Sequence, residues 1–284
     1  MKAWRWYCRL GILVFILANL LYAYLVERHH IEVTHHRLML PEWEGDTLRF
    51  VVLSDLHVRT DEEAYLRRVV QLALAQKPDA VFLLGDYVNR QSDNLPLEKV
   101  EELLRPLTAV PCYAVLGNHD YSYGSGKIRR LFRRLNIPMM EGKVHELTSG
   151  SGKLHIAGAR CMFTFLHPGT IPKPRPGIPY ILLSHSPAIS CFAPQGTSLI
   201  VSGHTHGGQV CLPFYGAIRM PDYKVERDQC SGLQTIDNRE VYISRGIGTS
   251  QMPVRYFCRP EMPVLEVCGR KAFTEQPQKN EPQS

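Results

Sequence analysis

The sequence VSGHTHGGQV, residues 201–210, joins an apolar run to two histidines that are separated by a single threonine. Side chains two positions apart on an extended segment point to the same face, so His204 and His206 can approach one common target. Glycines on both sides allow the backbone to turn sharply and to come close to a ligand. A histidine pair of this kind is typical either of a metal site or of a hydrogen-bonded loop, and the rest of the chain decides between them.

Five apolar runs of strand length end abruptly in polar groups of this kind. The runs are LRFVVLSDLH from Leu48, AVFLLGD from Ala80, CYAVLGNHD from Cys112, YILLSHSP from Tyr180 and LIVSGHTH from Leu199. Continuous apolar runs predict strands that are buried on both faces. Helical patterns at Glu62–Gln76 and Leu97–Leu107 lie between them. We therefore expect a largely parallel arrangement that gathers the polar groups at the carboxyl ends of the strands.

The side chains at these strand ends predict a metal site. A single aspartate at a strand end is usually a turn former, and a single buried histidine is usually a hydrogen-bonded core residue. Neither explanation accounts for His, Asp and Asn at five strand ends. Oxygen and nitrogen donors without cysteine favour Mn²⁺, Fe or Zn²⁺ and argue against a structural zinc site.

The ordered motifs SDLH, GD, GNHD, SHSP and GHTHGG resemble those of the calcineurin-like metallophosphoesterases. The later segment SRGIGTSQMPVRYFCRPEMPVLEV extends the likeness to membrane-associated bacterial phosphodiesterases of that family. The resemblance implies an α/β fold, a four-layer αββα sandwich with two mixed sheets, and a pair of divalent metal ions, with Mn²⁺ expected first and Fe or Zn²⁺ as alternatives. His119 would be the catalytic residue that donates a proton to the leaving oxygen. One metal would be bound by Asp55, His57, Asp86 and His206, and the other by Asp86, Asn118, His185 and His204.

One position departs from the family pattern. Related protein phosphatases carry an aspartate that orients the catalytic histidine, where GDYVNR has Asn89. Asp120 or Asp93 could take over this role, and Arg90 and Arg245 are candidate phosphate contacts. We expect hydrolysis of phosphodiester or pyrophosphate bonds in a lipid-linked or nucleotide-containing substrate. A phosphomonoesterase or protein phosphatase, and a non-catalytic scaffold, are the alternatives.

The N-terminus predicts a membrane anchor. Leu10–Val26 is an uncharged apolar stretch of about 17 residues, near the length that spans a bilayer, and no convincing signal-peptidase site follows it. We therefore expect a single-pass protein of the cell (inner) membrane. Basic residues before the stretch favour an outside domain, whereas cysteines dispersed singly in apolar contexts favour a reducing compartment, so the membrane face stays open. The net charge of +6 suits an anionic partner or a membrane surface but is too small to indicate nucleic acid.

The expected organisation is an anchor at 1–30, a juxtamembrane linker at 31–47, the metallophosphoesterase domain at 48–268 and a disordered tail at 269–284. Within the domain, GSGKIRRLFRRLN predicts a helix that begins near Ser125 and carries an apolar stripe and a basic face. This basic face has two interpretations. It is either the solvated side of a core-packed helix or a contact with anionic headgroups that brings a lipid-linked substrate to the metals.

Overall fold

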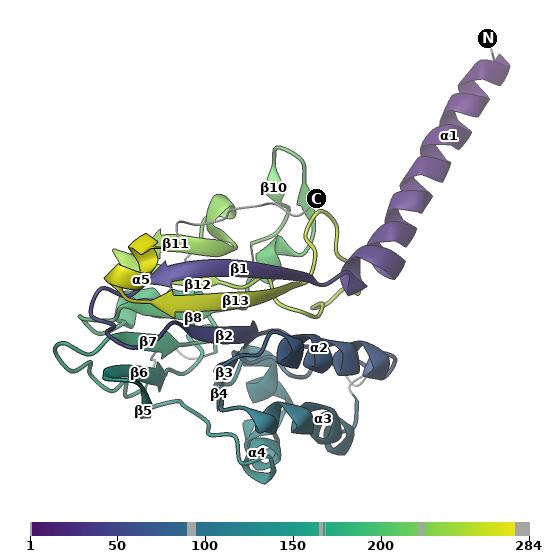
Figure 1. The fold of residues 1–284 in the computed structure, drawn as a ribbon. Coiled ribbons are helices and arrows are strands. Elements are labelled where there is room, and N and C mark those ends of the chain that lie inside the picture. The colour runs from purple at the N-terminus through teal and green to yellow at the C-terminus, as the bar shows by residue number, and fades with distance from the viewer. Residues whose placement is uncertain are drawn as a thin grey trace.

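The computed structural model describes residues 2–89, 95–164, 167, 169–220, 222 and 225–275. Two mixed β-sheets pack face to face (Figure 1). The five-stranded sheet has the order β1 (Glu32–Met39), β13 (Glu261–Cys268), β2 (Leu48–Leu53), β3 (Ala80–Leu83) and β4 (Cys112–Ala114). The six-stranded sheet has the order β11 (Gly232–Ile236), β12 (Arg239–Ile243), β8 (Leu199–Ser202), β7 (Tyr180–Leu183), β6 (Gly152–Gly158) and β5 (Val144–Ser149).

All five apolar runs form strands, and the strands that carry the motifs are parallel as expected. In the first sheet β2, β3 and β4 run parallel, and in the second sheet β7 is parallel to β6 and β8, which in turn pairs in parallel with β12. Each strand ends a few residues before its polar group, as β2 ends at Leu53 before Asp55. The carboxyl ends of both sheets therefore deliver the motif residues to one edge of the sandwich.

Three buried clusters separate four layers, which confirms the expected sandwich. Helices α2 (Glu63–Ala75), α3 (Leu97–Leu104) and α4 (Asn118–Arg134) cover the first sheet with side chains such as Phe132. Between the sheets, Phe50 stacks on Phe82 with ring centroids 4.6 Å apart. On the outer face of the second sheet, Ile189 of the 3₁₀ helix η4 (Pro187–Phe192) and Ala217 close a third cluster. Within the described ranges, this outer layer consists of 3₁₀ turns, loops and the short hairpin of β9 (Cys211–Leu212) and β10 (Gly216–Ala217) rather than α-helices.

The N-terminal helix α1 (Lys2–Leu21) projects away from the sandwich (Figure 1). With the turns that follow, it forms a helical segment, Trp4–His29, that is long and apolar enough to cross a membrane. The end of this segment contacts the domain. The Tyr256 hydroxyl donates a hydrogen bond to Asn19 Oδ1 (2.8 Å), Ala23 is buried, and the Glu27 carboxylate accepts from the backbone N–H of Cys258 (2.7 Å).

Two local expectations are corrected by the structure. The stretch 31–47 is not a linker throughout, because β1 pairs in parallel with β13 along its whole length. An edge strand tolerates polar residues, so β1 lacks the continuous apolar run that reveals the inner strands. The tail is not wholly disordered, because Arg270–Glu275 forms the helix α5, while 276–284 lie outside the described residues. The basic helix begins near Ser125, as expected, because α4 (Asn118–Arg134) consists of two helices joined across a kink at Gly124, where φ is 126°.

Candidate metal centre

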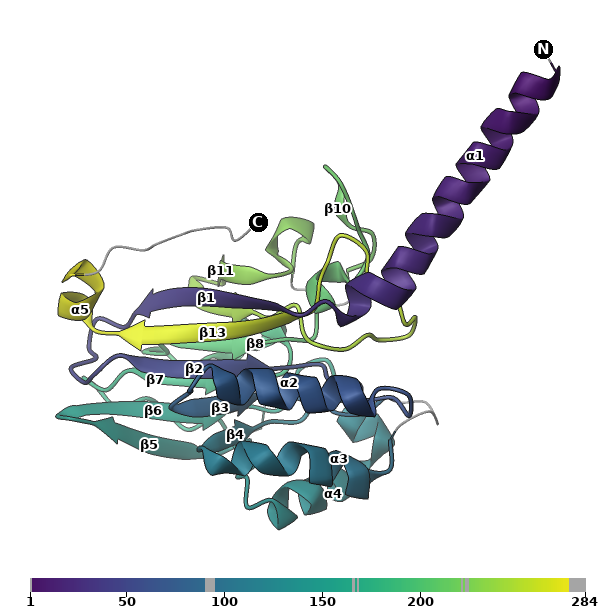
Figure 2. The ribbon, with the colours of Figure 1, turned by 45° about the vertical axis from the view of Figure 1, so that its right-hand side comes forward.

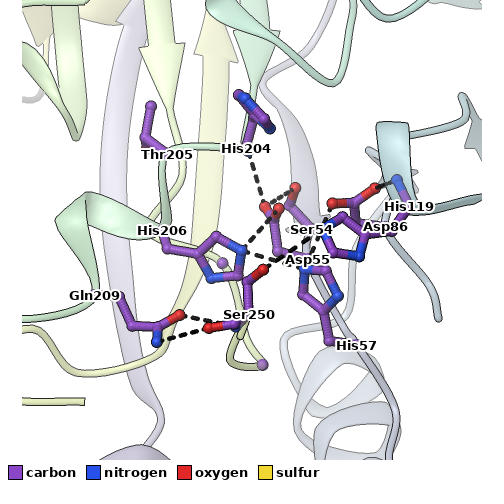
Figure 3. Close-up of polar contacts among 12 residues, drawn as sticks. Ser54, Asp55, His57, Asp86, His119, His204, Thr205, His206, Gln209 and Ser250 are labelled. Carbon is purple, nitrogen blue, oxygen red and sulfur yellow. Dashed lines mark hydrogen bonds and ion pairs between the residues drawn. The ribbon is translucent and has the colours of Figure 1, made fainter. Parts of the chain in front are cut away.

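The loops after β2, β3, β4, β7 and β8 bring the motif residues of both sheets together, and Figure 3 shows residues from the loops after β2, β3, β4 and β8. Their side chains form overlapping groups that could hold metal ions, and within each group the ligand atoms lie within 4.8 Å of one another. The three groups are Asp55 with His57 and His206, Asp86 with His185 and His204, and His57 with Asp86 and His119.

The first donor set is built around Asp55. Its Oδ2 accepts hydrogen bonds from Ser54 Oγ (2.5 Å) and from the backbone N–H of His204 (3.0 Å). Its Oδ1 is buried without a hydrogen-bond partner and lies 3.4 Å from His206 Nε2. That nitrogen lies in turn 3.2 Å from His57 Nε2. One carboxylate oxygen is therefore fixed by hydrogen bonds, while the other faces two imidazole nitrogens, and a cation would satisfy all three atoms.

The second donor set is built around His185. Its Nδ1 lies 2.9 Å from the carbonyl oxygen of Leu84. Because a carbonyl only accepts, Nδ1 carries the proton and Nε2 is directed to the cluster. The distances from His185 Nε2 are 3.1 Å to His204 Nδ1, 3.0 Å to Asn118 Oδ1 and 3.3 Å to Asp86 Oδ2.

Asp86 faces both donor sets. Its Oδ2 lies 3.3 Å from His185 Nε2 and 3.5 Å from His57 Nε2, while its Oδ1 accepts a hydrogen bond from the backbone N–H of His119 (2.8 Å). The loop that carries Asp86 is held by Asp120, whose carboxylate accepts the backbone N–H groups of residues 86, 87 and 117. A carboxylate shared between two donor sets is the arrangement that a dinuclear metal site requires.

Burial sets the protonation of the cluster. It lowers the pKa of His57 and of His204 to about 3 and holds the pKa of His206 well below its usual value. These imidazoles are therefore neutral at pH 7, which is the form that binds metals. Burial acts to raise the pKa of Asp86, but the charge of His185 and its hydrogen bond, together with the other neighbouring histidines, outweigh burial, and the pKa is lowered. Against the opposing effect of burial, the pKa of His185 is raised by Asp86, so its ring also carries a proton on Nε2, but that proton can be donated to only one neighbour at a time. The acceptor lone pairs of the cluster therefore outnumber its protons, and the donor set fits divalent cations.

The backbone at the cluster is strained. Five of the side chains stand on left-handed backbone, with φ of 54° at Asp55, 42° at His57, 54° at Asp86, 70° at His204 and 53° at His206. Such conformations cost about 1–3 kcal/mol each and persist where the surroundings enforce them. Neighbouring glycines make room, because a Cβ at position 117 would collide with the Asp86 carboxylate and one at 203 would lie 2.5 Å from Asp55 Oδ2.

His119 lies half-buried at the rim of the cluster, with its ring centroid 4.7 Å from that of His57. Its Nε2 lies 3.5 Å from the hydroxyl of Ser250. Gln209 clamps Ser250, because its side chain accepts from the backbone N–H of Ser250 (2.8 Å) and donates to the Ser250 carbonyl (3.0 Å) (Figure 3). Neither residue was predicted from the sequence, in which the only signal is that Gln209 directly follows the GHTHGG motif.

The residues considered for orienting His119 have other contacts. Asn89 donates from Nδ2 to the carbonyl oxygen of His57 (3.2 Å), so it supports the backbone of a cluster residue. The Asp120 carboxylate is engaged with three backbone N–H groups, which is a different role from the one that the sequence suggested. Asp93 lies outside the described residues.

The two arginines expected at the phosphate have different outcomes. Arg90 lies outside the described residues. Arg245 forms ion pairs with Glu32 (2.8 Å) and Glu261 (3.4 Å), and these contacts favour a structural role. A third arginine, Arg255, is fully buried and was not predicted from the sequence. Its guanidinium donates to the carbonyl oxygens of residues 206, 245, 246, 248 and 258, and thereby ties the His206 loop to the segment after β12.

A two-sheet sandwich with this donor set at its carboxyl edge defines a metallophosphoesterase. The chain belongs to the calcineurin-like phosphoesterase family, whose model matches residues 48–208, more than half of the chain. It is 30% identical over 257 residues to the uncharacterized metallophosphoesterase YkuE of Bacillus subtilis (strain 168), over 86% of this chain and 88% of the relative. It is 27% identical over 256 residues to the phosphodiesterase YaeI of Escherichia coli (strain K12), over 87% and 92%. It is also 26% identical over 277 residues to the UDP-2,3-diacylglucosamine pyrophosphatase LpxG of Chlamydia muridarum (strain MoPn / Nigg), over 77% and 83%.

Proposed function

We propose that the protein is a dinuclear-metal phosphoesterase that hydrolyses phosphodiester or pyrophosphate bonds. The observation that carries the proposal is the position of Asp86 Oδ2, which faces His57 Nε2 on one side and His185 Nε2 on the other. The names of two relatives, a phosphodiesterase and a pyrophosphatase, support this reaction class. Carboxylate, amide and imidazole donors suit Mn²⁺ first, with Fe and Zn²⁺ as alternatives. The proposed ligands are Asp55, His57, Asp86 and His206 for one ion and Asp86, Asn118, His185 and His204 for the other.

The chain's own residues have separate proposed roles. The two ions, when bound, would neutralise charge on the phosphoryl group and activate water. His119 would donate a proton to the leaving oxygen, which is the task of a positioned general acid. Its backbone N–H holds Asp86 Oδ1, so the proton donor and the shared ligand keep a fixed relation to each other. The Ser250 hydroxyl, clamped by Gln209, limits the movement of the His119 ring.

The proposal also includes a single-pass anchor in the cell membrane and a lipid-linked or nucleotide-containing substrate. The length and apolar composition of Trp4–His29 support the anchor. The name of the relative LpxG specifies a nucleotide-linked pyrophosphate substrate that carries two acyl groups. A substrate of that class is held at a membrane surface, where an anchored enzyme meets it.

The proposal is tested by comparing the rate of hydrolysis of a diester, bis-p-nitrophenyl phosphate, with that of a monoester, p-nitrophenyl phosphate. The full chain is assayed in detergent with Mn²⁺, Zn²⁺ and Mg²⁺ in turn, after removal of metal. We expect metal-dependent hydrolysis of the diester, faster than that of the monoester. A preference for the monoester would favour a phosphomonoesterase or protein phosphatase, and failure to cleave either compound with any of the metals would favour a scaffold.

A further inference from the structure

Exposed apolar side chains gather beside the candidate metal centre. The hairpin of β9 (Cys211–Leu212) and β10 (Gly216–Ala217) begins a few residues after His206 and carries four of them. The loop 249–258 carries two more. We call this set the apolar rim, and it consists of Leu212, Phe214, Tyr215, Ile218, Met252 and Phe257.

The two segments of the apolar rim are joined to each other and to α1. The backbone N–H of Cys211 donates to the carbonyl oxygen of Tyr256 (2.8 Å), and Gln209 holds Ser250, so the hairpin and the loop 249–258 form one unit. The Tyr256 hydroxyl donates to Asn19 in α1. Figures 1 and 2 show the hairpin pointing to the same side of the domain as that toward which α1 projects. The anchor, the rim and the metal centre are therefore neighbours.

The position of Asn19 fixes the depth of this unit relative to a bilayer. Asn19 lies seven residues before the end of the apolar run Leu10–Val26, which is about 10 Å of helix rise. Tyr24, Leu25 and Val26 are still exposed beyond it. The run is barely long enough to span a bilayer, so these last residues must also lie in lipid or in its interface. Tyr256 and the loop around it then reach at least the headgroup region.

The charges beside the apolar rim suit this location. Arg219 and Arg259 are exposed and flank the two segments, and the guanidinium of Arg227 lies 4.3 Å from the ring centroid of Tyr215. Basic and aromatic side chains are enriched where a protein meets anionic headgroups. The basic helix α4, in contrast, lies on the opposite side of the domain from α1 in both views (Figures 1 and 2). Its basic face is therefore better explained as a solvated surface than as a headgroup contact.

We infer that the apolar rim inserts into the headgroup region of the bilayer beside α1 and presents the metal centre to a lipid-linked phosphodiester or pyrophosphate. The membrane contact follows from the anchor and the rim, and the substrate class rests on the proposed phosphoesterase function. Contact with lipid would let the enzyme act on a headgroup bond without extracting the acyl chains from the bilayer.

The insertion is tested without reference to activity. The full chain is reconstituted in vesicles of phosphatidylcholine and phosphatidylglycerol that contain brominated phosphatidylcholine as a quencher. Phe214→Trp is introduced with Trp4→Phe and Trp6→Phe, which leaves only the buried Trp43 as background. Lys127→Trp on the exposed face of α4 is the matched control. We expect strong quenching at position 214 and little at 127, and equal quenching at the two positions would overturn the inference.

The link to the substrate is tested with two double variants. The rim variant combines Phe214→Glu with Ile218→Glu, and the control variant on α4 combines Arg130→Glu with Arg133→Glu. The rate of hydrolysis is measured on two phosphodiesters that both release p-nitrophenolate. One is phosphatidic acid whose phosphate carries one p-nitrophenyl ester, presented in vesicles, and the other is soluble bis-p-nitrophenyl phosphate. We expect the rim variant to lose about tenfold on the vesicle substrate, from the lost apolar contact. We expect it to keep its activity on the soluble diester, and the control to keep both activities.

The outcomes separate the two proposals. Quenching at position 214 without hydrolysis of either diester would reject the proposed function and leave the membrane contact standing. Hydrolysis of the soluble diester without quenching at 214 would reject the membrane contact alone. Loss of a dimer in the rim variant by analytical ultracentrifugation, with vesicle hydrolysis retained, would show that the apolar rim contacts a second copy of the chain instead.

Discussion

Replacement of Asp86 by asparagine is the sharpest test of the metal centre, because the new side chain has the same shape. Its amide oxygen can still accept the backbone N–H of His119, as Oδ1 does. The group that replaces Oδ2 is an NH₂ donor, which cannot bind a cation. The loop therefore keeps its conformation, while both proposed donor sets lose their shared ligand.

The size of the effect follows from linkage. A metal at a concentration one hundredfold above its Kd stabilises the folded state by about 2.7 kcal/mol per site. Two sites contribute roughly 5 kcal/mol, and 1 kcal/mol shifts the Tm by about 2–4 °C in a chain of this size. We therefore expect Mn²⁺ to raise the Tm of the wild type by about 10–20 °C. For Asp86→Asn we expect only a small fraction of that shift.

The assay combines differential scanning fluorimetry with elemental analysis of the dialysed full chain. The wild type should hold two metal ions per chain, and Asp86→Asn should lose most of the bound metal together with its activity. Asp228→Asn, which removes an exposed carboxylate in the 3₁₀ turn η6 (Arg227–Gln229), is the control and should match the wild type. Two bound ions and an undiminished Tm shift in Asp86→Asn would refute the shared-ligand argument, as would a single ion in a fully active wild type.

Four further predictions follow from the contacts. His119→Ala should keep the metals but lose about 10²–10⁴-fold in kcat on alkyl esters and less on p-nitrophenyl esters; equal losses in steady-state assays of both would contradict the leaving-group role. Gln209→Ala should lower kcat without loss of metal, because Ser250 is released, and unchanged kcat would contradict the clamp. Arg255→Met leaves several buried carbonyl groups unpaired and should lower the free energy of unfolding by at least about 3 kcal/mol in urea titrations; a smaller change would refute this. The full chain should stay in the membrane pellet after carbonate extraction, and a cleaved N-terminus would show a signal peptide instead.

The sequence predicted the inner strands well and the periphery poorly, for one physical reason. Strands such as β3 are buried on both faces, so they require uninterrupted apolar runs that can be recognised without a structure. The edge strand β1 has mostly polar residues and gains its stability from pairing with β13, more than two hundred residues away. The outer layer of 3₁₀ turns has no periodic pattern, and the kink at Gly124 is visible only as a backbone conformation.

The candidate ligands were predicted because each stands directly after a recognisable strand. The contacts that hold them in place were not, because they join segments that are distant in the sequence and chemically ordinary. Gln209 and Ser250 are separated by 41 positions, and Arg255 contacts only backbone carbonyls and a thiol among its hydrogen-bond partners. The basic face of α4 left two interpretations open from the sequence, a solvated surface or a headgroup contact, and the position of that helix on the side of the domain opposite α1 favours the solvated surface (Figure 2).

The strained backbone of the cluster explains why metal binding and stability should be coupled in this chain. Left-handed conformations at Asp55, His57, Asp86, His204 and His206 cost about 1–3 kcal/mol each. The sum of these costs is comparable with the net free energy of unfolding of an ordinary domain. The loop backbones are held in these conformations because they donate hydrogen bonds to the Asp120 carboxylate and accept them from the Arg255 guanidinium, but the lone pairs of the cluster still face one another without enough protons. Bound cations would remove that repulsion, so metal binding should add stability to loops whose conformation the hydrogen bonds already set.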